Sequence, residues 1–126
     1  MKMTDITRPV RKLLPLKYCG AVIVAAGNAS RMGGIDKVMA KLGGEPMILR
    51  TVRAFQECDP IQEIVIVTRE DLLEPIAALT AGMDKVKAVV SGGKSRQESV
   101  SKGLAALSDK VKLVAIQDGA RPFASW

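Results

Sequence analysis

The chain has 126 residues, of which 48% are apolar and 25% are charged, so its size and composition predict one globular domain and exclude intrinsic disorder. The 19 Lys and Arg residues exceed the 13 Asp and Glu residues, and the net charge of +6 fits an anionic partner without choosing between nucleic acid, a membrane and a small phosphorylated ligand. The absence of histidine excludes Ser-His-Asp catalysis and histidine-ligated zinc within this chain, and an aromatic content of 3% disfavours a stacking platform for single-stranded nucleic acid.

The first 17 residues are basic and contain no continuous apolar segment, so we interpret them as a leader or tail and not as a secretory signal. The domain is expected over residues 18–126. Its longest purely apolar run, Ala21–Ala26, is far shorter than the ~20 residues that a membrane span needs. Cys19 and Cys58 lack metal-ligand spacing, and we expect reduced thiols in a cytoplasmic protein over a single disulfide.

Four apolar runs alternate with amphipathic segments along the chain. The continuous runs predict strands that are buried on both faces, and the amphipathic segments predict helices. Pro46 suits the first turn of one helix, and Ser95 with Glu98 forms a capping box for another. In chain order we expect a strand at Ala21–Ala26, a small-residue loop at Gly27–Gly34, a helix at Pro46–Gln56, a strand at Glu63–Thr68, a helix at Asp71–Ala81 closed by Gly82, a strand at Val86–Val90, a helix from Ser95 to about Leu107, a strand at Lys112–Gln117 and a loop at Asp118–Trp126.

The order β-α-β-α-β-α-β predicts an α/β fold with a mainly parallel sheet and helices on both of its faces. In such sheets ligands bind beyond the carboxyl ends of the strands. Four segments come to that edge, namely 25–34, 68–71, 91–97 and 117–122. Three of them are rich in small residues and basic side chains, which predicts a site for an anion at this edge.

The first segment, Ala25–Gly34, has the small residues that allow backbone N–H groups to approach a polyphosphate. Arg31 and Lys37 would add positive charge beside the phosphate oxygens. The segment contains neither a Walker A motif nor the dinucleotide fingerprint GxGxxG. The plainer interpretation is a tight turn with solvated basic residues.

The second segment, Ser91–Ser99, places two glycines before a capped helix, so backbone N–H groups and the helix N-terminus could face an anion. The alternative is a glycine turn with an ordinary N-cap. Ser99 falls inside the helix and could point to a ligand or to solvent.

The third segment, Gln117–Pro122, places Asp118 at the end of a buried strand. Mg²⁺ prefers one or two carboxylates together with substrate phosphates, so Asp118 is a candidate ligand. The alternative is an Asp that caps the loop, with Arg121 as its structural partner.

Taken together, the three segments resemble one enzyme family. Val24–Met32 resembles the AAGxGxRM signature of nucleotidyltransferases. Gly92–Val100 and Asp118–Pro122 resemble the GGxxRxxSV and DxARP stretches of the 2-C-methyl-D-erythritol 4-phosphate cytidylyltransferases of the non-mevalonate isoprenoid pathway. The resemblance covers about residues 18–125.

The resemblance implies a Rossmann-like three-layer nucleotidyltransferase fold that binds CTP and Mg²⁺ or another divalent cation. Methylerythritol phosphate would attack the α-phosphate of CTP and release pyrophosphate. By motif position, Arg31 and Lys37 would stabilise the developing charge and Asp118 would hold the metal. The nucleotide would be lined by Ala25, Ala26, Gly27, Gly93 and Ser99, the last two at the cytosine and ribose.

The chain departs from the family pattern in residues and in length. Ala29 stands where the family usually has Gly, and Lys94 occupies a position that is often acidic. Family members are longer, so the C-terminal half, with the acceptor pocket and a dimerisation arm, is expected to be missing and the activity of this chain weak. The alternatives are a ribitol 5-phosphate cytidylyltransferase, with its acceptor pocket in the same half, and a non-catalytic nucleotide-binding module. We expect no nucleic-acid partner, because no helix is strongly basic.

Overall fold

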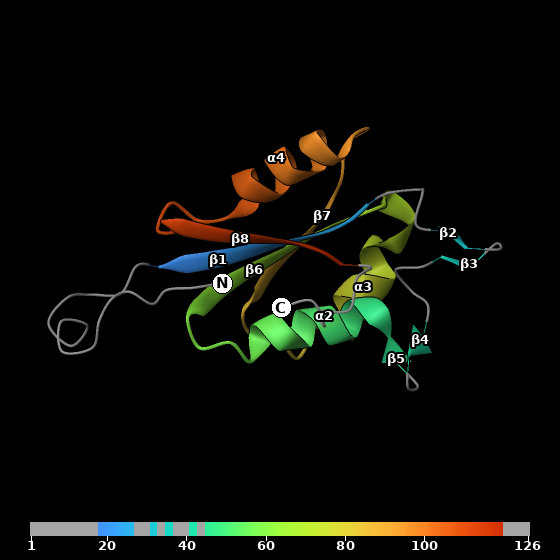
Figure 1. Cartoon of the computed structure of the whole chain (residues 1–126), viewed down its shortest axis with the longest axis horizontal. Coiled ribbons are helices and arrows are strands. Elements are labelled where there is room, and N and C mark those ends of the chain that lie inside the picture. Colours follow the sequence, from blue (N-terminus) through green and yellow to red (C-terminus); the bar gives the residue numbers. More distant parts are fainter. Residues whose placement is uncertain (1–17, 27–30, 33–34, 37–40, 43–44, 120–126) are drawn as a thin grey trace, which may run out of the picture.

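A four-stranded parallel sheet forms the centre of the protein (Figure 1). The computed structural model describes residues 18–26, 31–32, 35–36, 41–42 and 45–119. The strand order is β7-β6-β1-β8, so β6 and β1 are the inner strands. The strands are β1 Cys19–Ala25, β6 Ile61–Thr68, β7 Val86–Ser91 and β8 Leu113–Asp118. The predicted parallel α/β sheet is confirmed.

Helices cover both faces of the sheet and make three layers (Figure 1). On one face lie α2 (Met47–Gln56) and α3 (Leu73–Leu79), which follows a short 3₁₀ turn, η2 (Glu70–Leu72). On the other face lies α4 (Arg96–Ala106). The arrangement confirms the predicted three-layer fold.

The sheet separates two hydrophobic cores because successive side chains of a strand point to opposite faces. On β1, Ala21 and Ile23 pack with residues of α2 and α3, whereas Val22 and Val24 pack on the side of α4. Both inner strands are buried on both faces, and Ile66 of β6 is 0% exposed. This burial is the reason that these strands have continuous apolar sequences.

Gly103 lets α4 lie close to the sheet. A Cβ at this position would come within 2.5 Å of Val22 Cγ1 and 2.9 Å of Val67 Cγ2. The close approach also buries Ser99, one turn earlier in α4, so that it is 2% exposed. Packing at Gly103 therefore helps to set the position of the helix at the carboxyl edge.

The structure corrects several predicted boundaries. Two short antiparallel pairs occur between β1 and α2, and the first lies partly inside the predicted loop 27–34. Strands of two residues are too short to produce an alternating pattern in the sequence. These strands are β2 (Arg31–Met32), β3 (Ile35–Asp36), β4 (Lys41–Leu42) and β5 (Glu45–Pro46).

Two further boundaries differ from the predictions. The helix predicted over Asp71–Ala81 is an α-helix only from Leu73 to Leu79, because its start is the 3₁₀ turn η2. Its C-cap is Thr80 and not the predicted Gly82. Asp118 is the last residue of β8 and not the first residue of a loop, since it still pairs with Val24 of β1.

Candidate active site at the carboxyl edge of the sheet

The end of β1 and the loop between β7 and α4 meet at Gly92. A Cβ at Gly92 would lie 2.5 Å from Ser99 Oγ and 2.6 Å from the Cβ of Ala26. Real Cβ atoms do not approach so closely, so only glycine fits between these two residues. Two segments that are far apart in sequence are therefore in direct contact at the carboxyl edge.

Hydrogen bonds from α4 shape this loop. The Gly93 N–H donates to Ser99 Oγ at 3.1 Å, and the Lys94 N–H donates to Glu98 Oε1 at 2.6 Å. Ser95 Oγ in turn accepts from the Glu98 N–H at 3.1 Å, which confirms the predicted cap. Side chains of the first turn of α4 thus hold the loop before it.

These contacts change the expected role of the glycine loop. The Gly92 N–H donates to Thr68 O at 2.9 Å, so the amides of residues 92, 93 and 94 are all engaged within the protein. They do not form the anion-binding surface that the glycine pattern suggested. An anion at this edge would instead meet the start of α4 and nearby basic side chains, one of which, Lys102, donates to the Gly92 carbonyl at 3.5 Å.

Thr68 links β6 to both neighbouring strands. Its hydroxyl donates to the Ala25 carbonyl at 3.3 Å, and its own carbonyl accepts the Gly92 amide. Thr68 is fully buried, so it fixes the ends of three strands relative to one another. The sequence places Thr68 in the segment 68–71 at this edge, but a polar residue that ends an apolar run does not indicate this linking role.

The end of β8 lies beside the end of β1. Asp118 pairs with Val24, and the Gly119 N–H donates to the Val24 carbonyl at 2.9 Å. The buried Thr51 of α2 approaches Gly119 O at 3.4 Å. A Cβ at Gly119 would lie 2.7 Å from Ile48 Cδ1 and 3.1 Å from Ala25 Cβ, so the chain leaves β8 packed tightly against α2 and β1.

The family model for 2-C-methyl-D-erythritol 4-phosphate cytidylyltransferase matches residues 19–125, which include all three of these segments. The chain belongs to this family.

Relatives and solved structures agree with this membership. Proteins named 2-C-methyl-D-erythritol 4-phosphate cytidylyltransferase from Dehalococcoides mccartyi and Symbiobacterium thermophilum are 48% identical over 105 residues and 44% identical over 102 residues. These matches cover 82% and 80% of this chain but 46% and 42% of the relatives. The crystal structure of a 4-diphosphocytidyl-2C-methyl-D-erythritol synthase from Anaerococcus prevotii superposes with a TM-score of 0.73 at 33% identity and covers 86% of this chain and 45% of that one. The chain spans about half the length of the relatives it matches.

For the cytidylyltransferase signature at the end of β1, the structure describes Ala25 and Ala26 but not Gly27. Ala25 is 3% exposed and its side chain packs in the core with α2, so it could meet a ligand only through its main chain. Ala26 is half-buried beside Gly92. Arg31 pairs through its backbone with Asp36, and the placement of its side chain, like all of Lys37, lies outside the described residues.

An ion pair that the sequence did not reveal follows β6 at the same edge. Arg69 Nε and Nη2 donate to the two carboxylate oxygens of Asp71 at 3.1 and 3.2 Å. The Arg69 side chain is 14% exposed and that of Asp71 is 68% exposed. The segment 68–71 was expected at this edge, but a charged pair two residues apart has no distinctive sequence pattern.

A magnesium ion fits the site only as an ion shared with the substrate. Within the described ranges no three Asp, Glu, Cys or His residues are grouped to hold a metal ion. Asp118 offers one carboxylate at the carboxyl edge. One carboxylate together with phosphate oxygens and water is a usual set of ligands for Mg²⁺.

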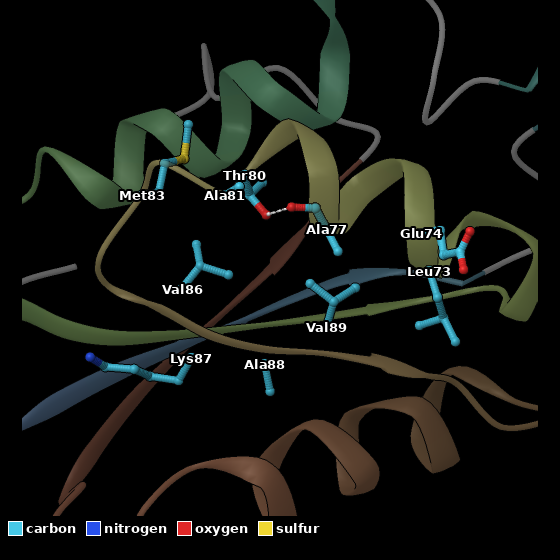
Figure 2. A pocket seen from close by; sticks show the side chains of 10 residues that line it. All are labelled: Leu73, Glu74, Ala77, Thr80, Ala81, Met83, Val86, Lys87, Ala88 and Val89. Atoms are coloured by element: carbon cyan, nitrogen blue, oxygen red, sulfur yellow. Dashed lines mark hydrogen bonds between the residues drawn. The ribbon is translucent and has the colours of Figure 1, made fainter.

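A cavity of about 400 Å³ lies between α3 and β7, away from these residues (Figure 2). It contains none of the predicted site residues. Its lining is mostly apolar, with Leu73, Met83 and Val89 among the residues that contribute, and Glu74 and Lys87 carry its charges. An apolar lining does not suit a nucleoside triphosphate, so we place the candidate site at the carboxyl edge.

In the part of the chain that is described, no helix is long and apolar enough to cross a membrane.

Proposed function

We propose that this chain carries the nucleotide-binding half of an enzyme that transfers CMP from CTP to 2-C-methyl-D-erythritol 4-phosphate. A phosphate oxygen of the acceptor attacks the α-phosphorus of CTP, the bond from that phosphorus to the oxygen bridging to the β-phosphate breaks, and pyrophosphate leaves. The observation that carries the proposal is the meeting of three segments at one edge. Gly92 lies in close contact with Ala26 and Ser99, and the Gly119 N–H donates a hydrogen bond to the Val24 carbonyl.

In this proposal the nucleotide lies over the ends of β1 and β7, against Ala26, Gly27 and Gly93 and the main chain of Ala25. Ser99 acts by holding Gly93, since its hydroxyl accepts the Gly93 amide and is buried. Arg31 and Lys37 stabilise the charge that develops on the α-phosphate and on the departing pyrophosphate. Asp118 would hold Mg²⁺, which supplies positive charge on the phosphate oxygens.

The acceptor, a sugar-alcohol phosphate, and a cytoplasmic setting belong to the same proposal. More than half of each relative lies outside the matched region, and we assign acceptor binding to that part of the family. Cys19 is buried and Cys58 is half-buried, and neither forms a disulfide, which is usual in a reducing compartment.

Thermal unfolding in the presence of nucleotide tests the nucleotide site. Because a ligand that binds only the folded state stabilises it, Mg²⁺ with CTP at 100 times its Kd should add about 2.7 kcal/mol, and Mg²⁺ with ATP should add less. Asp118→Asn should remove the part of the stabilisation that depends on Mg²⁺, and the exposed Asp109→Asn is the matched control. A cooperative unfolding transition that neither nucleotide shifts would contradict the proposal.

A further inference from the structure

The ion pair between Arg69 and Asp71 lies at the end of β6, and the proposed transfer gives it no role. β6 lies between β1 and β7 in the sheet. Neighbouring strands are about 4.8 Å apart, so the ends of β1 and β7 are separated by about 10 Å. The proposed function, on which this inference rests, lays the nucleotide over both of these ends. Such a nucleotide must pass over the end of β6.

Hydrogen bonds of Thr68 keep the three strand ends together. Its hydroxyl donates to the Ala25 carbonyl at 3.3 Å, and its carbonyl accepts the Gly92 amide at 2.9 Å. Arg69 is the next residue along the chain, so it leaves the sheet between the ends of the two neighbouring strands. The ion pair is therefore at the centre of the surface that the nucleotide would cover.

The ion pair fixes the orientation of an exposed carboxylate. Arg69 Nε and Nη2 donate to the two oxygens of Asp71 at 3.1 and 3.2 Å. The Arg69 side chain is 14% exposed, whereas that of Asp71 is 68% exposed. In the 3₁₀ turn η2 the Leu72 N–H donates to the Arg69 carbonyl at 2.9 Å, which brings the two side chains to the same side. Because a two-point contact with a planar guanidinium restricts a carboxylate, Asp71 presents its oxygens in one orientation.

The chemistry of a carboxylate limits what Asp71 can bind. An ionised carboxylate only accepts hydrogen bonds, and its two oxygens offer about four acceptor positions, so one that is held by an arginine can accept more. The phosphates of CTP are acceptors with negative charge and do not suit it. A metal ion is also a poor fit, because the charge of Arg69 offsets that of Asp71. The groups of CTP that donate hydrogen bonds are the cytosine amine and the ribose hydroxyls.

We propose that Asp71 accepts a hydrogen bond from the ribose 2′-hydroxyl of CTP and that Arg69 is its positioning residue. In the proposed site the base lies beside Gly93 after β7 and the phosphates lie beside the end of β1. The ribose, which joins them, then lies over the end of β6. In dinucleotide-binding α/β folds an acidic residue that follows the glycine-rich turn binds the ribose 2′-hydroxyl by the same chemistry. The site therefore selects ribonucleotides over deoxyribonucleotides.

The affinities for CTP and 2′-deoxy-CTP test this assignment, since the two nucleotides differ only in the hydroxyl that Asp71 binds. Titration calorimetry of the full chain with Mg²⁺ should give a Kd for CTP that is lower by about tenfold or more, because a hydrogen bond to a charged group has about this effect. Asp71→Ala should remove most of the preference. Glu70→Ala, which removes the neighbouring exposed carboxylate, should leave it unchanged.

The possible results separate this inference from the proposed function. Equal Kd values for CTP and 2′-deoxy-CTP in the parent protein would overturn the role of Asp71 and leave the proposed function standing. Failure of both nucleotides to bind would overturn both proposals. If Asp71→Ala weakened both nucleotides by the same factor, Asp71 would act on a metal ion or on the fold, and the ribose assignment would be wrong.

Arg69→Gln tests the positioning role. The substitution removes the two-point contact and keeps the Asp71 carboxylate, so the preference for CTP should fall several-fold. Adding Asp71→Ala should cause no further loss than Asp71→Ala alone, because residues that act through one contact are not additive. A purely structural ion pair would lower the unfolding temperature and the affinity for both nucleotides without changing the ratio of the two Kd values. That result, or additive losses, would overturn the role of Arg69.

Discussion

One hydroxyl group, that of Ser99, connects the helix α4 to the loop that follows β7. It accepts the Gly93 amide, and it lies so close to Gly92 that no side chain fits there. The hydroxyl is buried, so its effect on a nucleotide would pass through the shape of the loop. From the sequence, Ser99 could have faced a ligand or solvent. The structure shows neither, because the packing of α4 against the sheet buries Ser99 beneath the loop.

Ser99→Ala should leave the buried Gly93 amide without its acceptor. We expect a loss of about 1–2 kcal/mol in the free energy of unfolding, because a buried donor without a partner costs about that much. The stabilisation by Mg²⁺ and CTP should fall as well, since the loop is no longer held. Ser101→Ala makes the same chemical change at an exposed position of α4 and serves as the control in denaturant unfolding.

Residues of the candidate site were predictable from the sequence where their position after a predicted strand was sufficient to place them. Asp118 and Gly93 follow the predicted strands, and the structure places both at the carboxyl edge, Asp118 as the last residue of β8. Thr68 and Thr51 were not predictable, because each acts through a hydrogen bond to a segment distant in sequence. Arg31 and Lys37 stay predictions.

At the amino ends of the strands, opposite the candidate site, Glu63 joins β6 to the turn between α4 and β8. Its carboxylate accepts hydrogen bonds from the Ser108 amide at 3.0 Å and from the Ser108 hydroxyl, and it is 5% exposed. Burial raises the pKa of Glu63, but the hydrogen bonds from Ser108 and Tyr18 and the charge of Lys87 outweigh burial and lower the pKa below its ordinary value of 4.5. This contact holds two elements together from the amino edge.

The lowered pKa of Glu63 predicts a loss of stability in acid. A carboxyl group whose pKa is lowered by folding stabilises the protein above its ordinary pKa, and this contribution disappears as the pH falls below about 4.5 and through the lower pKa of the folded state. Glu63→Gln should therefore be less stable at neutral pH by about 1–2 kcal/mol and should lose less stability on acidification. Urea unfolding between pH 7 and pH 3 measures the stability at neutral pH and its loss in acid, and the exposed Glu74→Gln is the control. Equal dependence of stability on pH in Glu63→Gln and the parent protein would contradict the lowered pKa of Glu63.

At the scale of elements, the sequence predicted the main strands and helices within about two residues at most ends. Continuous apolar runs, the amphipathic segments between them and the Ser95–Glu98 cap were sufficient signals. The helix predicted at 71–81 is two residues shorter at each end, since its first turn is a 3₁₀ turn and the helix stops at Leu79. The short pairs β2–β3 and β4–β5 carry too few residues for any periodicity.

At the scale of the whole molecule, the stability of the protein depends on its two inner strands, β1 and β6, whose side chains contribute to the hydrophobic core on each face of the sheet. Ile66 of β6 is fully buried in the core shared with α2 and α3. Ile66→Ala should cost about 2–5 kcal/mol and Ile66→Val about 0.5–1.5 kcal/mol, because the cost grows with the volume of the cavity. A domain with a typical stability of about 5–15 kcal/mol should still unfold in one transition, which calorimetry or denaturant titration would show. Equal effects of the two substitutions would mean that the core relaxes around the change.

The sequence by itself determined the fold class and the family of the chain, and it predicted the carboxyl edge as the place of the site. These depend on local patterns, namely the period of apolar residues, the caps and three short motifs, all of which are present before the chain folds. The tertiary structure alone decided how the glycine loop is used, with the amides of residues 92–94 hydrogen-bonded inward, and how Thr68 joins the ends of three strands. Both depend on strand order and on contacts between segments distant in sequence, which packing of the whole sheet establishes.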